Sequence, residues 1–155
     1  MKEEILKALK ELPVQVEEVD YLKRGYHLEV SLDPEKVRGF ASIMRNHGFY
    51  PVFVTAVHLA PLMEVVYQFA SHSTPCRIVG RTPVPEDNRV PTISDIFQGA
   101  NWHERETWEM YGVVFDHHPC LEPLLLPEDA AELRPLLKAG DRVKTTDQVR
   151  WQIGN

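Results

Sequence analysis

The sequence predicts an α+β domain in which helices pack on a mostly antiparallel, mixed sheet. Segments with helical spacing of apolar residues alternate with strand-like segments in the coarse order α-β-β-α-β-β-β-α-α. The length of 155 residues suits a single hydrophobic core. We therefore expect one domain over residues 1–137, which ends in a proline-rich irregular segment, and a C-terminal tail over 138–155.

The first elements follow from apolar periodicity. Residues 2–12 place Ile5, Leu9 and Leu12 at i, i+4 and i+7, which predicts a short amphipathic helix. Residues 14–22 and 26–32 alternate like strands around Lys23-Arg24-Gly25, so the pair predicts a hairpin.

A second helix is expected over residues 34–47. Asp33 is a typical N-cap before Pro34, and Gly48 supplies a left-handed stop at the other end. Its apolar stripe follows the helical period and should face the core; it consists of Val37, Phe40, Ala41 and Met44.

Three strands and a short helix complete the prediction. Residues 50–58, 62–70 and 76–81 are rich in β-branched and aromatic side chains. Eight of the twelve prolines lie between 75 and 135, which predicts irregular chain there apart from a helical turn over 92–97 and a helix over 101–111. Asn101 and Gly112 are the expected caps of that helix.

Charge and composition exclude several functions. A formal net charge of −6 provides no cationic surface for nucleic acid or for an anionic membrane. No apolar run is long enough to span a bilayer, and the first residues do not resemble a secretory signal, so we expect a cytoplasmic protein. Two cysteines, Cys76 and Cys120, make neither a disulfide framework nor a CxxC motif.

The segment from Asn101 to Gly112 is the densest in polar and aromatic residues. Neighbouring helical residues point about 100° apart, so Glu104, Arg105 and Glu106 cannot converge on one small catalytic site. A solvated charged face is the simplest interpretation. Aromatic residues on more than one side of the helix favour instead a helix that is buried from two sides or docks a partner. Within the helix Arg105 has only the poorly oriented Glu109, so its best partner should lie elsewhere.

Two other functions are open. His117, His118 and Cys120 are residue types that zinc prefers, which suggests a small metal-binding domain, although neighbouring side chains in extended chain point apart and a fourth ligand is not apparent. Glu104 or His118 could instead serve as the acid or base of a freestanding enzyme. The simplest role of His118 is a turn histidine that bonds to backbone carbonyls, with Pro119 fixing the bend.

Residues 60–129 resemble the C subunit of bacterial NADH-quinone oxidoreductase, respiratory complex I, and related subunits of membrane-bound hydrogenases. The resemblance rests on the run from Glu104 to Phe115, on His118-Pro119 and on Leu124 to Asp129, together with shorter matches upstream. The family usually has glycine where this chain has His117, and an arginine pair where it has Glu122-Pro123.

The resemblance implies a subunit of the peripheral arm that has no catalytic residue, cofactor or metal of its own. Flavin (FMN), iron-sulfur clusters and quinone would belong to partner subunits, and this chain would dock against the quinone-site subunit on the cytoplasmic side of the inner membrane. The whole complex would pass electrons from NADH to quinone and translocate protons. An equivalent subunit of a [NiFe] hydrogenase or of another donor:quinone oxidoreductase is the alternative. The expected partner interface comprises Trp102, Glu104, Arg105, Glu106, Trp108, Tyr111 and His118.

Overall fold

The computed structural model describes residues 2–59, 61–130 and 132–138, and the predicted tail beyond Lys138 lies outside them. The α+β class is confirmed. Five strands form a mixed sheet in the order β1-β2-β5-β4-β3, in which β2 and β5 are parallel and all other neighbours are antiparallel. The strands are β1 (Gln15–Glu18), β2 (Leu28–Ser31), β3 (Phe49–Leu59), β4 (Leu62–Ser71) and β5 (Arg77–Pro83).

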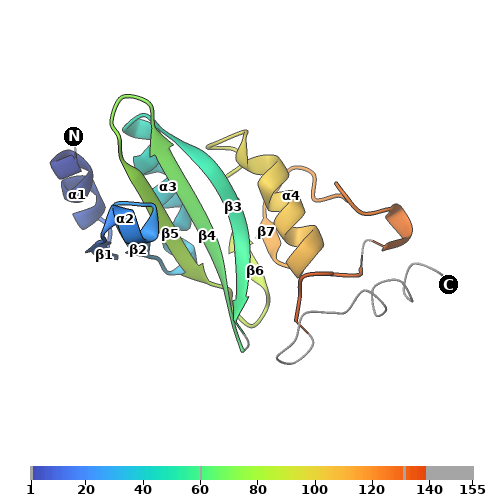
Figure 1. Ribbon diagram of the computed structural model, residues 1–155. Helices are drawn as coiled ribbons and strands as arrows, with labels where there is room; N and C mark the ends of the chain where they lie inside the picture. The colour runs from blue at the N-terminus through green and yellow to red at the C-terminus, as the bar shows by residue number, and fades with distance from the viewer. Residues whose placement is uncertain (1, 60, 131, 139–155) are drawn as a thin grey trace.

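Helices α1 (Lys2–Lys10) and α3 (Val37–Asn46) cover one face of this sheet (Figure 1). The predicted stripe of α3 is buried, and it joins Ile5 and Leu9 of α1 in one core cluster with the strands. Gly80 of β5 lets α3 approach closely, since a Cβ there would lie 2.6 Å from the ring of Phe40. The second helix differs from the prediction at its start, because Pro34–Lys36 form a 3-10 turn and the Asp33 side chain caps nothing.

The predicted strand over 14–22 is too long. It ends at Glu18 and is followed by the one-turn helix α2 (Tyr21–Arg24). The Asp20 side chain accepts a hydrogen bond from the Leu22 N–H at 3.0 Å, and Gly25 adopts φ +78°, so local capping ends the strand. The two strands still pair antiparallel, as the predicted hairpin requires.

Helix α4 (Ala100–Tyr111) packs along β3, the edge strand of the sheet (Figure 1). It covers an edge that would otherwise expose unpaired backbone groups. Gly112 ends the helix at φ +82°, as predicted, but Gly99 rather than Asn101 stands at its start. The preceding turn is confirmed, because the Ile96 and Phe97 N–H groups both donate to the Ile93 carbonyl.

A small parallel pair, β6 (Arg89–Pro91) and β7 (Val114–Asp116), brackets α4 in sequence and was not predicted. It brings residues on either side of α4 together, because Val90 pairs with Phe115 and Pro91 with Asp116. Both Val90 and Phe115 are buried in the main core. The segments before and after α4 are thereby paired with each other and anchored in the main core.

Candidate functional site

Helix α4 is hydrogen-bonded to three other segments of the same chain. The side chains of Glu104, Arg105 and Glu109 bind residues 92–93 before the helix and the loop over residues 122–126 after it. The third segment, residues 118–120, is attached through the ring of His118, which faces the Asn101 carbonyl of α4. The site is therefore a helix with loops fixed around it, and its outer surface is made by those loops.

Glu104 holds the segment before α4, and its side chain is fully buried. Its carboxylate accepts a hydrogen bond from the Ile93 N–H at 2.8 Å and another from the Thr92 hydroxyl. Burial raises the pKa of Glu104 to about 7, although both hydrogen bonds act in the opposite direction. On the other side of this segment, Arg38 of α3 donates to the Thr92 carbonyl and forms a bidentate pair with Asp95.

His118 lies beside Glu104, with 3.8 Å between its Nε2 and the Glu104 Oε2, and neither side chain is exposed. The Cys120 N–H donates to the His118 Nδ1 at 3.1 Å, so the proton of the neutral ring lies on Nε2 and faces the Asn101 carbonyl at 3.2 Å. Burial lowers the pKa of His118. The predicted bond to a backbone carbonyl is present at Nε2, whereas Nδ1 accepts from a backbone N–H instead of bonding a carbonyl.

Glu109 holds the loop after the helix. Its fully buried carboxylate accepts hydrogen bonds from three successive N–H groups, those of Leu124, Leu125 and Leu126, at 2.9 to 3.0 Å. Three donors on one carboxylate satisfy a buried charge that would otherwise be costly. A leucine-rich loop is thus held with its backbone inward, and the Leu125 side chain is 61% exposed.

Arg105, one turn before Glu109 in α4, binds the same loop. Its Nε donates to the Glu122 carbonyl at 3.0 Å and its Nη2 to the Pro123 carbonyl at 2.7 Å. The prediction that Arg105 finds its partners off the helix is confirmed, and those partners belong to this chain. Further along, Arg134 lies 4.5 Å from the centre of the Trp108 ring and donates to the Glu109 carbonyl.

The predicted interface residues differ in how far their side chains are exposed. Trp102 is 67% exposed and Glu106 is exposed, whereas Glu104 is fully buried. Trp108 and Tyr111 are partly buried against the core. Trp102 borders an open depression of about 520 Å³ that Asp95, Gln98, Asn101, His117 and Pro119 also line. The groups at this site that another molecule can touch are therefore Trp102, Glu106 and the loops that α4 holds.

The alternative functions gain little from this geometry. Among the described residues, no three His, Cys, Asp or Glu side chains are grouped as a metal ion would need. His118 already uses both ring nitrogens, and Cys120 is exposed. Glu104 and His118 have no exposed side-chain surface, so neither can reach a substrate for acid or base chemistry in this chain.

Sequence reasoning missed the role of Glu109 and the way Glu104 works. Spacing within α4 could have indicated that Glu104 is buried, because it lies on the helical stripe of Ala100 and Thr107 at i, i+4 and i+7. The loop partners could not be found in this way. They lie 11 to 17 residues away and are backbone groups, which no side-chain pattern reveals.

Residues 30–146 match the family model described as "Respiratory-chain NADH dehydrogenase, 30 Kd subunit". The chain belongs to this family. It is 47% identical over 110 residues to the C subunit of a NADH-quinone oxidoreductase from Roseiflexus sp. (strain RS-1), a match that covers 66% of this chain and 63% of that protein. The chain thus matches less than two thirds of the length of this relative.

The chain is also similar to proteins with other names. The C subunit of the F(420)H(2) dehydrogenase from Methanosarcina mazei is 39% identical over 77 residues, or 49% of each chain. A trypsin-resistant fragment of Nqo5 matches 77% of this chain and 98% of its own length, with a TM-score of 0.65 and 26% identity. A chain of a membrane-bound sulfane sulfur reductase, an archaeal respiratory complex, matches 90% of this chain and 85% of its own length, with a TM-score of 0.77 and 27% identity.

Proposed function

We propose that this chain is a structural subunit in the peripheral arm of a NADH:quinone oxidoreductase and that it docks against the quinone-site subunit. The observation that carries the proposal is the family match over residues 30–146. The geometry of α4 supports it, because Glu104, Arg105 and Glu109 use their hydrogen bonds to shape loops of this chain. A rigid, shaped surface is what a docking subunit needs.

The proposed interface keeps all the residues predicted from the sequence but gives them two roles. Trp102 and Glu106 would touch the partner, since they are exposed on α4. Glu104, Arg105 and His118 would act through the loops that they position. Trp108 and Tyr111, which pack against the core, would fix the orientation of the helix.

The cofactors and the chemistry would belong to the partner subunits. Two cysteines, one buried and one exposed, cannot supply the four thiolates of an iron-sulfur cluster. We therefore expect FMN, iron-sulfur clusters and quinone in other chains, and no turnover by this chain alone. In the part of the chain that the structure describes, no helix is long and apolar enough to cross a membrane. The chain would be held at the cytoplasmic side of the inner membrane by the complex.

The electron donor is a separate matter, and a second candidate function follows from it. The sulfane sulfur reductase chain covers more of this structure than the Nqo5 fragment does, and one relative belongs to an F(420)H(2) dehydrogenase. An equivalent subunit in a complex with another donor, a [NiFe] hydrogenase included, is therefore the alternative. Its place in the assembly would be the same.

Purification from native membranes tests the proposal. An affinity tag on this chain should retrieve cluster-bearing subunits that mass spectrometry identifies, and NADH should reduce quinone in that preparation. Reduction by a different donor and not by NADH would select the alternative. A tagged chain that retrieves no redox subunit would contradict both.

Variants of Trp102 test the interface. Trp102→Ala should lower the yield of copurified complex roughly tenfold or more, because exposed tryptophans are frequent anchors of interfaces. Trp102→Phe, which keeps an aromatic side chain, is the matched control and should lose much less. Equal yields for wild type and Trp102→Ala would remove Trp102 from the interface.

A further inference from the structure

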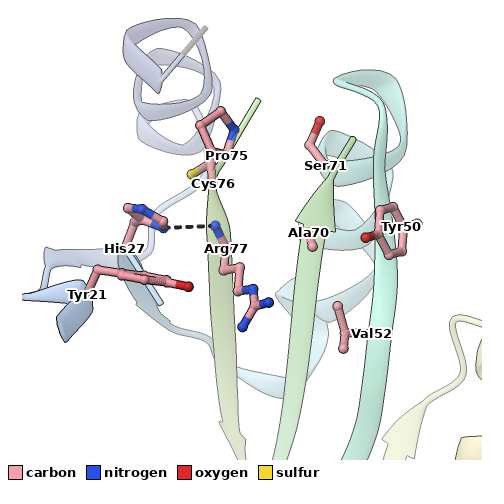
Figure 2. Close-up of a pocket in the computed structure, with 9 residues that line it drawn as sticks. All are labelled: Tyr21, His27, Tyr50, Val52, Ala70, Ser71, Pro75, Cys76 and Arg77. Carbon is pink, nitrogen blue, oxygen red and sulfur yellow. Dashed lines mark hydrogen bonds between the residues drawn. The ribbon is translucent and has the colours of Figure 1, made fainter. Parts of the chain in front are cut away.

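A groove of about 440 Å³ lies on the sheet, away from α4 (Figure 2). It opens on the face that α1 and α3 leave uncovered, at the ends of β3, β4 and β5 near α2 (Figure 1). Tyr50, Ala70 and Arg77 are neighbours in register across these three strands and form its floor. The remaining lining residues are Tyr21, His27, Val52, Ser71, Pro75 and Cys76.

Arg77 provides the positive charge of this groove. The backbone N–H of Arg77 donates to His27 Nδ1 at 3.0 Å (Figure 2). The Arg77 guanidinium makes no hydrogen bond or ion pair with the described residues. Most arginines in the described part of this acidic protein bind other groups of the chain. Those that bind a carboxylate or a carbonyl of the chain are Arg38, Arg45, Arg81, Arg89, Arg105 and Arg134.

Two aromatic rings flank Arg77, and both are held in place before any partner arrives. Tyr21 stacks on His27 with 4.5 Å between ring centres, and Tyr50 stacks on His72 at 4.3 Å. Both tyrosines remain exposed, at 42% and 37%. Because the rings are already ordered, little side-chain entropy would be lost when they become buried.

We propose that this groove docks another protein subunit of the assembly through a carboxylate side chain, which pairs with the Arg77 guanidinium between Tyr21 and Tyr50. The proposal rests on the proposed function for the existence of an assembly, and adds a second contact surface on a different face. Tyrosine and arginine around an apolar floor are the composition of interface hot spots. Val52 and Ala70 supply the apolar part of the lining.

The composition favours a protein carboxylate over a small anion. Phosphate sites usually combine several basic groups or a row of backbone N–H donors, whereas Arg77 is the only lysine or arginine among the lining residues. The groove is also open on one side, so a small ligand would keep much of its surface in water. A protein surface can cover the groove and its rim together.

Charge reversal tests the proposal in cells that express the whole complex. Tagged chains carrying Arg77→Glu should retrieve roughly tenfold less complex than wild type. Arg24→Glu is the matched control, since Arg24 is exposed and does not line the groove. Circular dichroism melts of the free variants should match, because the Arg77 backbone bond to His27 does not involve the guanidinium.

The outcomes separate this proposal from the proposed function. If wild type retrieves no redox subunit, the proposed function fails. If wild type assembles and Arg77→Glu retrieves as much complex as Arg24→Glu, only the groove proposal is overturned.

Photocrosslinking identifies the occupant. Benzoylphenylalanine introduced at Tyr50 in the assembled complex should crosslink to a different polypeptide, at a peptide that contains Asp or Glu. Crosslinks to a second copy of this chain, to this chain itself or to no protein would overturn the proposal. Binding of inorganic phosphate at Arg77 by the free chain, without a crosslink to another polypeptide in the complex, would do so as well.

Discussion

At Glu104, hydrogen bonding and burial have opposite effects on the charged carboxylate. Its carboxylate is useful as an acceptor for Ile93 and Thr92, yet it lies in a fully buried position. Burial outweighs the two hydrogen bonds, so its pKa is raised to about 7 from 4.5. Asp95 adds to this rise, while Arg38 opposes it. The protonated form is therefore stabilised by folding, and the charged form is penalised.

This sign predicts how stability depends on pH. Between pH 4.5 and 7 the folded protein binds a proton at Glu104 that the unfolded chain does not, so stability should fall as pH rises, by about 3 kcal/mol in total. Urea unfolding from pH 5 to pH 8 should show wild type losing most of this amount, about 2.5 kcal/mol, relative to Glu104→Gln, which cannot titrate. Glu106→Gln, an exposed change on the same helix, should follow wild type. Parallel curves for wild type and Glu104→Gln would contradict the prediction.

His117 stores strain in its backbone. It adopts φ +64°, in the left-handed region that favours glycine. The family that the sequence resembles usually has glycine at this position. For a residue with a Cβ, this conformation costs about 1 kcal/mol or more.

Comparing two substitutions isolates that strain. His117→Gly and His117→Ala both remove the imidazole, but only glycine relieves the left-handed conformation, so we expect the glycine variant to be more stable by about 1 kcal/mol. Chemical denaturation of the two free variants measures the difference. A more stable alanine variant would show that the φ of +64° does not hold in solution.

Helix α4 shows how far sequence patterns reach at the scale of an element. Its existence, its last residue and the Gly112 stop were predicted, because caps and periodicity are local. Asn101 was wrongly expected as the N-cap, since the helix already begins at Ala100 behind Gly99. The pair β6 and β7 was missed because each strand has three residues, too few for a period to show. Their pairing depends on tertiary packing of Val90 and Phe115.

The loop held by Glu109 provides a test at this scale. Glu109→Gln keeps the side-chain size but replaces one acceptor oxygen by an amide donor, which faces the N–H groups of residues 124–126. Loss of these charge-assisted bonds should cost roughly 2 to 3 kcal/mol and lower the melting temperature by roughly 5 to 10 °C. Amide exchange at residues 124–126 should become faster. Glu106→Gln is the control on the exposed side of the helix, and unchanged exchange in Glu109→Gln would refute the role of Glu109 in holding this loop.

At the scale of the whole molecule, the sequence indicates the family, whereas the structure shows which residues are exposed and where the surface is hollowed. The run from Glu104 to Phe115, together with the ordered motifs before and after it, suggested the family to which the chain belongs. It could not show that Glu104 is buried while Trp102 is exposed, because that depends on which side of α4 meets β3. The groove at Arg77 was also invisible, since it joins residues of α2, β3, β4 and β5 that share no local pattern.

Trp102 on α4 and Arg77 on β5 belong to different depressions with no lining residue in common, so the two proposed contact surfaces are separate. Changes at sites that share no partner usually add in free energy. The double variant Trp102→Ala/Arg77→Glu should therefore bind the complex with a loss equal to the product of the two single losses, within about twofold. Titration of each variant into membranes that lack this protein measures the affinities. A double variant no weaker than the weaker single variant would mean that the two surfaces contribute to one shared contact, and the picture of a protein held on two faces would fail.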